Sequence, residues 1–143
     1  MALLRSWVTS ANDPNGPFPL NNLPYGVFVQ GDGDLHCGVA IGDQILNLTR
    51  LEEDEHLNLP EILIFAIGSW NDFMELGPKV WAAFRAFLIE ALEEGSPKQA
   101  TFSGYLVPMA EANMAMPFDV AEYTDFYSGR QHATNVGTMF RGA

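Results

Sequence analysis

Between residues 25 and 48 the chain holds three short apolar runs separated only by turn residues, and this spacing limits the folds open to it. Residues 25–30 are β-branched and aromatic, residues 35–41 are apolar, and residues 44–48 alternate with the two-residue period of a strand. A glycine-rich cluster at 31–34 and the pair Gly42–Asp43 provide the turns. Parallel strands need long crossovers, so connections this short predict an antiparallel meander of three strands.

The middle of the chain has the spacing of amphipathic helices. Ser69, with Asp72 three residues later, suits a capping motif for a short helix that Gly77 ends. Pro78 is well placed in the first turn of a longer helix. Apolar residues then recur at steps of three and four, which predicts one buried stripe: Val80, Trp81, Phe84, Phe87, Leu88, Ala91 and Leu92.

The two ends of this region set the predicted domain limits. Residues 1–24 are rich in Pro, Asn and Gly and are predicted to form an irregular arm. Residues 113–116 form a short apolar run that Pro117 ends, as is typical of an edge strand. We therefore predict an α+β domain over residues 1–117 and the start of a second unit at 118–143.

The composition excludes some classes of function. Seven Lys and Arg against eighteen Asp and Glu give a net charge of −11, which would repel a nucleic acid or an anionic membrane. The single cysteine, Cys37, cannot form an internal disulfide and sits in an apolar run, so we expect a buried, inert thiol. There is no run of eighteen apolar residues and no signal-peptide pattern, and the expected location is the cytoplasm.

Chemically active side chains concentrate in residues 123–141 (YTDFYSGRQHATNVGTMFR). If residues 124–137 are helical and Gly137 ends the helix, Asp125 and His132 share a face about 10 Å apart along the axis. Two ligands of one metal need a spacing of three or four residues, so this pair would instead bracket a substrate, with a cation at one end and a base at the other. The alternative is structural: a helix-start carboxylate, a half-buried histidine, and solvated or paired guanidinium groups at Arg130 and Arg141.

Three stretches carry a resemblance to a known family. Residues 123–142, residues 18–28 (FPLNNLPYGVF) and residues 38–48 (GVAIGDQILNL) resemble the fumarylacetoacetase family. The first is similar to the signature near the start of the catalytic domain, and the other two to the N-terminal arm, first strand and next hairpin. The resemblance covers the chain from about residue 18 onward.

The resemblance implies a fold and an activity. Members pair a small SH3-like N-terminal barrel with a larger β-rich catalytic domain and form homodimers. They hydrolyse a carbon–carbon bond of a β-diketo acid, 4-fumarylacetoacetate, to fumarate and acetoacetate in the breakdown of tyrosine and phenylalanine. A divalent cation, calcium or magnesium, is the implied cofactor. By motif position, Asp125 matches a metal ligand, Tyr127 and Arg141 match groups that contact the substrate, and His132 matches the base that activates water.

Other parts of the family's site have no counterpart here. The further metal carboxylates, the acid that orients the histidine and a catalytic lysine are absent from these 143 residues. We therefore expect an N-terminal portion with a truncated start of the catalytic domain, inactive alone and completed by the missing domain. The alternative is a stand-alone interaction module whose apolar arm and helix stripe bind a partner chain.

Overall fold

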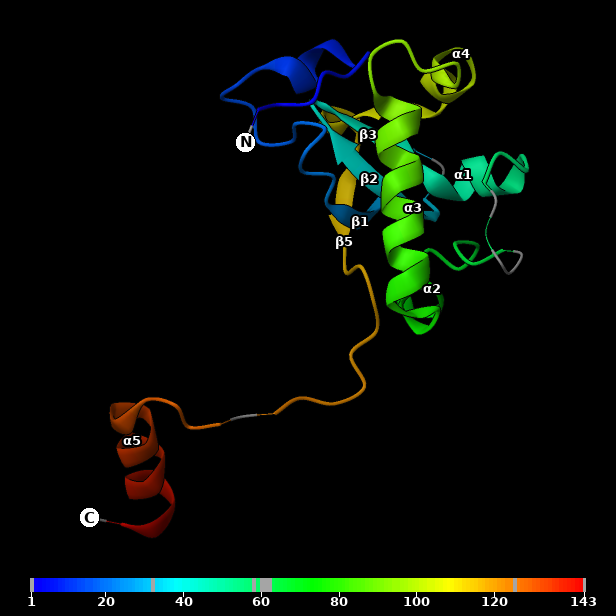
Figure 1. Ribbon diagram of the computed structural model, residues 1–143. Coiled ribbons are helices and arrows are strands. Elements are labelled where there is room, and N and C mark those ends of the chain that lie inside the picture. Colours follow the sequence, from blue (N-terminus) through cyan, green and yellow to red (C-terminus); the bar gives the residue numbers. More distant parts are fainter. Residues whose placement is uncertain (1, 32, 58, 60–62, 125, 143) are drawn as a thin grey trace.

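The computed structural model describes residues 2–31, 33–57, 59, 63–124 and 126–142 (Figure 1). Strands β1 (Tyr25–Val29), β2 (Leu35–Ile41) and β3 (Gln44–Asn47) form the predicted meander, with each pair antiparallel. The first and third strands each end one residue earlier than predicted: Gln30 lies outside β1, and Leu48 already belongs to helix α1 (Leu48–Glu53). The side-chain oxygen of Asn47 accepts a hydrogen bond from the Arg50 amide and so caps this helix.

Two short strands extend the meander into a five-stranded sheet. β5 (Asn113–Ala115) pairs with β1 and confirms the predicted edge strand. β4 (Leu106–Pro108) pairs with β3 and was not predicted, because it depends on the free edge of β3, which the sequence of these residues does not reveal. The order is β4-β3-β2-β1-β5, with every pair antiparallel. The predicted α+β class is confirmed, with an open antiparallel sheet.

The sheet must be strongly curved. β4 and β5 lie at opposite edges, yet only residues 109–112, including the single turn η3 (Met109–Glu111), connect them. A flat sheet of five strands is about 19 Å wide, and even a fully extended chain from residue 108 to 113 reaches only about 18 Å. A small apolar cluster of Phe28, Ile45 and Val107 lies under this connection and packs with Met109 and Ala112.

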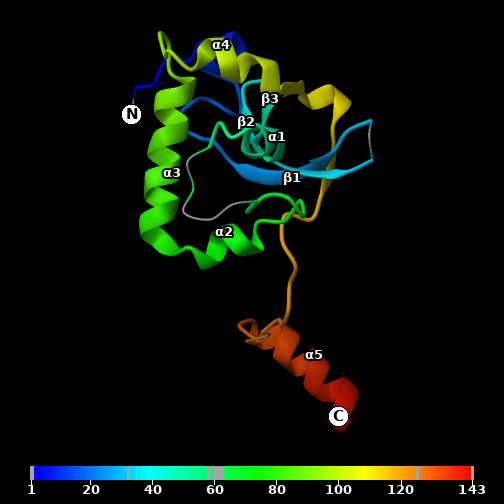
Figure 2. The ribbon, with the colours of Figure 1, turned by 90° about the vertical axis from the view of Figure 1, so that its right-hand side faces the viewer.

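The other face of the sheet carries the main core. Helices α2 (Asn71–Glu75) and α3 (Gly77–Leu92) lie beside it, followed by α4 (Gln99–Phe102) and η2 (Ser103–Tyr105) (Figures 1 and 2). Much of the predicted stripe of α3 is confirmed, because Phe84, Leu88, Ala91 and Leu92 are buried and Val80 and Phe87 pack against them.

Two details of the helices differ from prediction. Trp81 belongs to the predicted stripe but stays 39% exposed. The predicted Ser69 cap forms only in part: α2 begins one residue later, after Trp70, but the Ser69 hydroxyl accepts a hydrogen bond from the amide of Asn71, the first helical residue, at 3.3 Å and donates to the Asn71 side chain at 2.7 Å. Pro78 lies in the first turn of α3 as predicted.

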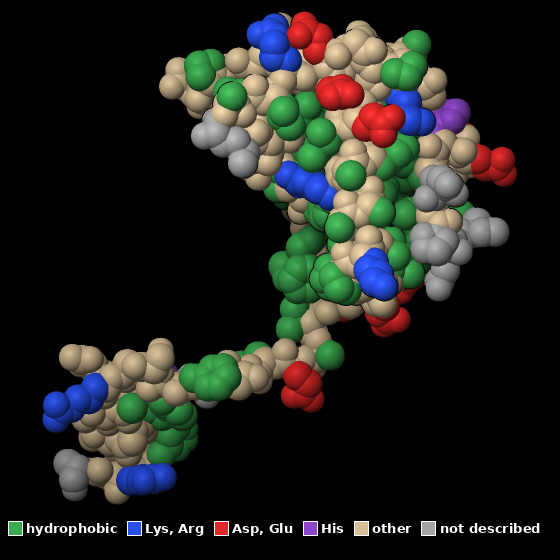
Figure 3. Space-filling model, in the orientation of Figure 1, with side chains coloured by type: hydrophobic (Ala, Val, Ile, Leu, Met, Phe, Trp, Pro, Cys, Tyr) green, Lys and Arg blue, Asp and Glu red, His purple; other side chains and the backbone are tan. Residues whose placement is uncertain are grey.

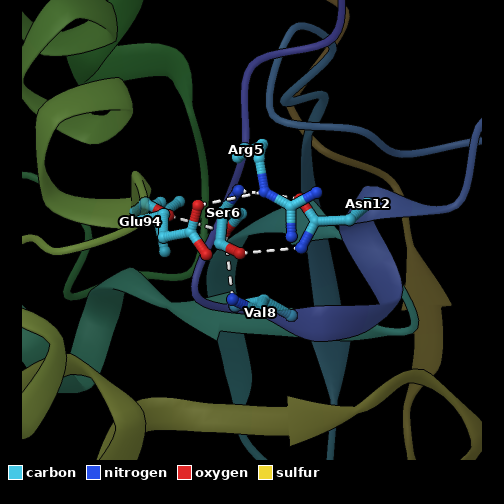
Figure 4. Close-up of polar contacts among 6 residues, drawn as sticks. Arg5, Ser6, Val8, Asn12 and Glu94 are labelled. Carbon is cyan, nitrogen blue, oxygen red and sulfur yellow. Dashed lines mark hydrogen bonds and ion pairs between the residues drawn. The ribbon is translucent and has the colours of Figure 1, made fainter.

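The N-terminal arm is irregular, as predicted, but it is part of the core. Leu20 and Leu23 are completely buried, and the Arg85 guanidinium donates to the carbonyls of Asn21 and Leu23 at 3.0 and 2.8 Å. Nearer the N-terminus, around η1 (Thr9–Asn12), the backbone of Ser6 exchanges two hydrogen bonds with the Asn12 side chain (Figure 4).

The same region of the arm is tied to the end of α3. The Ser6 hydroxyl donates to the Leu92 carbonyl at 2.6 Å, and the indole of Trp7 donates to the Ala91 carbonyl at 2.9 Å. Arg5 and Glu94 add an exposed ion pair beside them (Figure 4), which we expect to contribute little to stability. These contacts place the arm alongside the last turn of the longest helix.

Cys37 lies in β2 and has no exposed surface, which confirms the expected burial of its side chain. Burial, with the nearby Glu52 carboxylate, raises the pKa of the Cys37 thiol to about 12. At pH 8 only about one thiol in ten thousand would then be ionised, and the thiolate is the reactive form.

We predict that iodoacetamide labels Cys37 in the folded chain at least about 100-fold more slowly than in the guanidinium-unfolded chain at pH 8. Mass spectrometry of timed samples measures both rates. Similar rates in the two states would show that the thiol is accessible in the folded chain.

Candidate functional site

The chain leaves the folded body at a defined point. The Pro117 carbonyl accepts a hydrogen bond from the Trp70 amide at 2.9 Å. Two residues later, the Asn71 side chain accepts from the Asp119 amide at 2.8 Å and donates to the Asp119 carbonyl at 3.3 Å. These bonds at the start of α2 hold the exit as far as Asp119. No sequence pattern indicated that Asn71 has this role.

Beyond that point the chain is exposed and ends in helix α5 (Arg130–Arg141), which stands apart from the body (Figures 1 and 2). No residue of α5 is buried, and large apolar side chains face solvent along this segment, with Tyr123 87% and Phe140 82% exposed. None of the described helices, α5 included, is long and apolar enough to cross a membrane.

The predicted bounds of this helix are wrong. It begins at Arg130 rather than at 124, and it continues through Gly137 to Arg141. Residues 126–129 are not helical: Tyr127 has a left-handed φ of +47°, and Gly129 is the extended residue that precedes the helix. Gly142, with φ of +79°, follows the last helical residue.

This correction removes the spacing argument for Asp125. That argument required one continuous helix carrying Asp125, Gly129, His132 and Val136 on a common face, and the first helical residue is Arg130. Asp125 itself lies outside the described residues, so its position relative to His132 stays a prediction.

Two of the predicted site residues do meet. The rings of Tyr127 and His132 stack with centroids 5.4 Å apart and an angle of 26° between their planes. The contact joins the residues before α5 to its first turn, so the left-handed Tyr127 brings its phenol ring back over the start of the helix. The sequence predicted that both residues belong to the site, but it did not predict that their rings contact each other.

Arg141 does not join this pair. It lies nine residues after His132 on the same helix, a separation of about 14 Å along the axis and about half a turn around it. The two side chains therefore start from opposite sides of α5. A single small substrate could contact both side chains only if it lay across the helix, or if other parts of the protein changed the conformation of this segment.

The described residues do not fit a cation site of their own. No three His, Cys, Asp or Glu side chains gather closely enough to hold a metal ion in the part of the chain that the structure describes. Calcium takes about six to eight oxygen ligands, and magnesium needs about six. The chain accordingly offers at most one predicted ligand, Asp125, and we assign no chemical step to a metal.

We predict that calorimetric titration of the 143-residue chain with calcium or magnesium detects no stoichiometric site of micromolar or tighter affinity, because a single carboxylate cannot replace the hydration shell of either ion. The Asp125→Ala variant should give the same titration. A tight site that this substitution abolishes would show that the chain holds a metal by itself.

A second feature lies beside the exit. Aromatic and apolar side chains from β1, α2, α3 and the exit line a hollow of about 360 Å³: Tyr25, Trp70, Phe73, Met74, Trp81, Pro117 and Phe118. Sequence reasoning assigned Trp81 to the buried stripe and did not predict this hollow, because its walls come from segments far apart in the chain.

Comparison with known proteins now identifies relatives. A family model described as "Fumarylacetoacetase N-terminal" matches residues 21–117. The fumarylacetoacetase of Bos taurus is 42% identical over 151 aligned positions, which include 96% of this chain and 34% of the relative. Those of Homo sapiens and Caenorhabditis elegans are 40% and 41% identical, with 95% and 90% of this chain aligned to 34% and 32% of the relatives. The chain thus spans about a third of the length of the curated relatives it matches.

Proposed function

The chain belongs to the fumarylacetoacetase N-terminal family, and we propose that it is the N-terminal portion of an enzyme that hydrolyses 4-fumarylacetoacetate. The products would be fumarate and acetoacetate, in the breakdown of tyrosine and phenylalanine. The observation that carries the proposal is the identity of 40–42% to three fumarylacetoacetases over 90–96% of the chain.

The alignment also bears on the alternative of a stand-alone interaction module. Because 96% of the chain aligns with the bovine enzyme, most of residues 118–143 must be included. The segment that carries the candidate site residues is therefore related to the enzymes along with the folded body, and the module is not favoured.

For the fold of the body we propose an SH3-like barrel over residues 1–117. The curved five-stranded sheet supports this, as does the single turn η3 that connects its two edges. For residues 118–143 we propose the start of a β-rich catalytic domain. The hydrogen bonds between Asn71 and Asp119, where the chain leaves the body, support a boundary near residue 118.

In the complete enzyme we propose that His132 is the general base. A neutral imidazole that removes a proton from water generates the nucleophile that attacks a ketone carbon of the substrate. The stacked Tyr127 ring supports this role, since it restricts the orientation of the imidazole.

Tyr127 and Arg141 are the proposed substrate contacts. Attack on the ketone produces an oxyanion, which a guanidinium stabilises, and the departing carbon fragment carries negative charge as an enolate. Because Arg141 and His132 start from opposite sides of α5, the proposal requires either a substrate that lies across the helix or a catalytic domain that changes the conformation of this segment.

The remaining proposals concern the complete protein. Calcium or magnesium would be bound there, with Asp125 as one ligand and the other ligands from outside this chain. The complete protein would be a cytoplasmic homodimer with a small-molecule substrate and no nucleic acid or membrane partner, in keeping with the net charge of −11.

The test is to complete the chain. Residues 1–143 are fused to the remaining two-thirds of the bovine relative, and loss of fumarylacetoacetate is followed by absorbance. We expect hydrolysis by the fusion and none by the 143-residue chain alone. An inactive fusion, folded by circular dichroism and compared with active bovine enzyme in the same assay, would contradict the proposal.

A further inference from the structure

The hollow beside the exit is apolar although it opens to solvent. Its rim includes Met74 and Phe118, which are 41% and 40% exposed. Figure 3 shows hydrophobic side chains gathered where the chain leaves the body. Apolar surface grouped around a concavity is typical of a binding surface, whereas single exposed apolar side chains are ordinary.

Its walls are held in place by their own polar groups. The Trp81 indole donates to the Phe73 carbonyl at 3.0 Å, and the Trp70 indole donates to the Gly26 carbonyl at 2.9 Å. The rings of Tyr25 and Trp70 stack in parallel, with centroids 4.5 Å apart. With these indole donors paired inside the body, the rings offer mainly apolar surface to the hollow, and little reorganisation is needed to bind an apolar group.

The exit places the following chain next to this surface. Pro117 and Phe118 line the hollow, and the backbone is fixed through Asp119, so the 24 residues 120–143 join the hollow to any structure that follows residue 143. A linker of this length keeps an attached partner at an effective concentration on the order of millimolar, provided that it can span the distance. From Val120 onward no described residue is buried, and none of them lines the hollow.

We propose that the hollow seats an apolar side chain from the region that follows residue 143 in full-length relatives, and that this contact sets the angle between the N-terminal body and the catalytic domain. The inference rests on the proposed function. About two-thirds of the relatives' length lies outside the aligned region, and in a chain of that length it would be joined to the hollow through residues 120–143. A second copy of the body is a poorer occupant, because bodies this acidic repel one another.

The experiment compares amide hydrogen exchange of residues 70–81 in the 143-residue chain and in the fusion with the bovine catalytic region. We expect exchange at least about tenfold slower in the fusion. Met74→Glu, which puts a carboxylate at the rim, should abolish this added protection. Ile67→Glu makes the same change in charge at a 65% exposed apolar residue that does not line the hollow, and it should leave the protection intact.

Each other outcome has a defined meaning. Both variants are first checked as 143-residue chains by circular dichroism and thermal melting, so that loss of protection cannot be misfolding. Protection in the short chain that increases with concentration would make a second copy the occupant, and equal, concentration-independent protection in both chains would show that the added region does not occupy the hollow. Either result overturns the proposal.

The hydrolysis assay on the same samples separates this inference from the proposed function. If the fusion is active but the amides of residues 70–81 gain no protection, only the proposed docking surface is contradicted. If the fusion is inactive but shows added protection that Met74→Glu abolishes, only the proposed catalytic function is contradicted.

Discussion

Gly42→Ala is expected to lower the free energy of unfolding by about 2–5 kcal/mol. Gly42 turns β2 into β3 with φ of +58°, which costs any other residue about 1–2 kcal/mol. A methyl group would also overlap the N-terminal arm, where the Ala11 amide nitrogen would lie 2.6 Å and the Ser10 carbonyl carbon 2.9 Å from it. These are backbone atoms, which cannot move aside as a flexible side chain can. Urea unfolding followed by circular dichroism measures the loss.

Gly95→Ala is the matched control. Gly95 also has a positive φ, of +85°, but an added methyl group would meet nothing within 4 Å. Its cost should therefore be the conformational part alone, about 1–2 kcal/mol. If the two variants lose equal stability, the arm does not pack on the hairpin as the structure shows.

This contact illustrates where sequence reasoning succeeds and where it ends. The turn at Gly42 and the three strands around it could be predicted, because the signals lie within a few residues of each other. The helical period likewise identified the buried face of α3. The packing of residues 10 and 11 on the turn could not be predicted, because it joins segments some thirty residues apart and has no local pattern.

The same limit applies to the unexpected strand and to the exposed indole. β4 exists because residues 106–108 meet the free edge of β3, which their own sequence does not reveal. Trp81 has the correct helical spacing for burial, but only the fold shows that its position borders an open hollow.

The candidate site divides in the same way. Residue types and family motif selected Tyr127, His132 and Arg141, and the structure brings the first two together. The helix start was misplaced because nothing in the sequence marks Tyr127 as left-handed or excludes a helix over residues 126–129. Whether Arg141 and His132 can contact one substrate depends on residues outside this sequence. The sequence alone therefore could not predict it.

Replacing His132 with glutamine in the fusion is expected to lower turnover by about two to four orders of magnitude. Glutamine has a similar size and can still form hydrogen bonds, but it cannot accept a proton from water. The Michaelis constant should change little, because the proposed substrate contacts Tyr127 and Arg141 remain. Steady-state kinetics on fumarylacetoacetate from pH 6 to 9 separate the two quantities.

The matched control is His56→Gln. His56 follows helix α1 on the folded body, where its ring meets Tyr105 edge-on, with centroids 5.6 Å apart. The same substitution there should leave turnover within about twofold of the parent, since surface changes away from special features have small effects. Near-normal turnover of the His132→Gln enzyme across this pH range would place the general base in the catalytic region outside this chain. The stacked imidazole beside Tyr127 would then serve only to pack the start of α5.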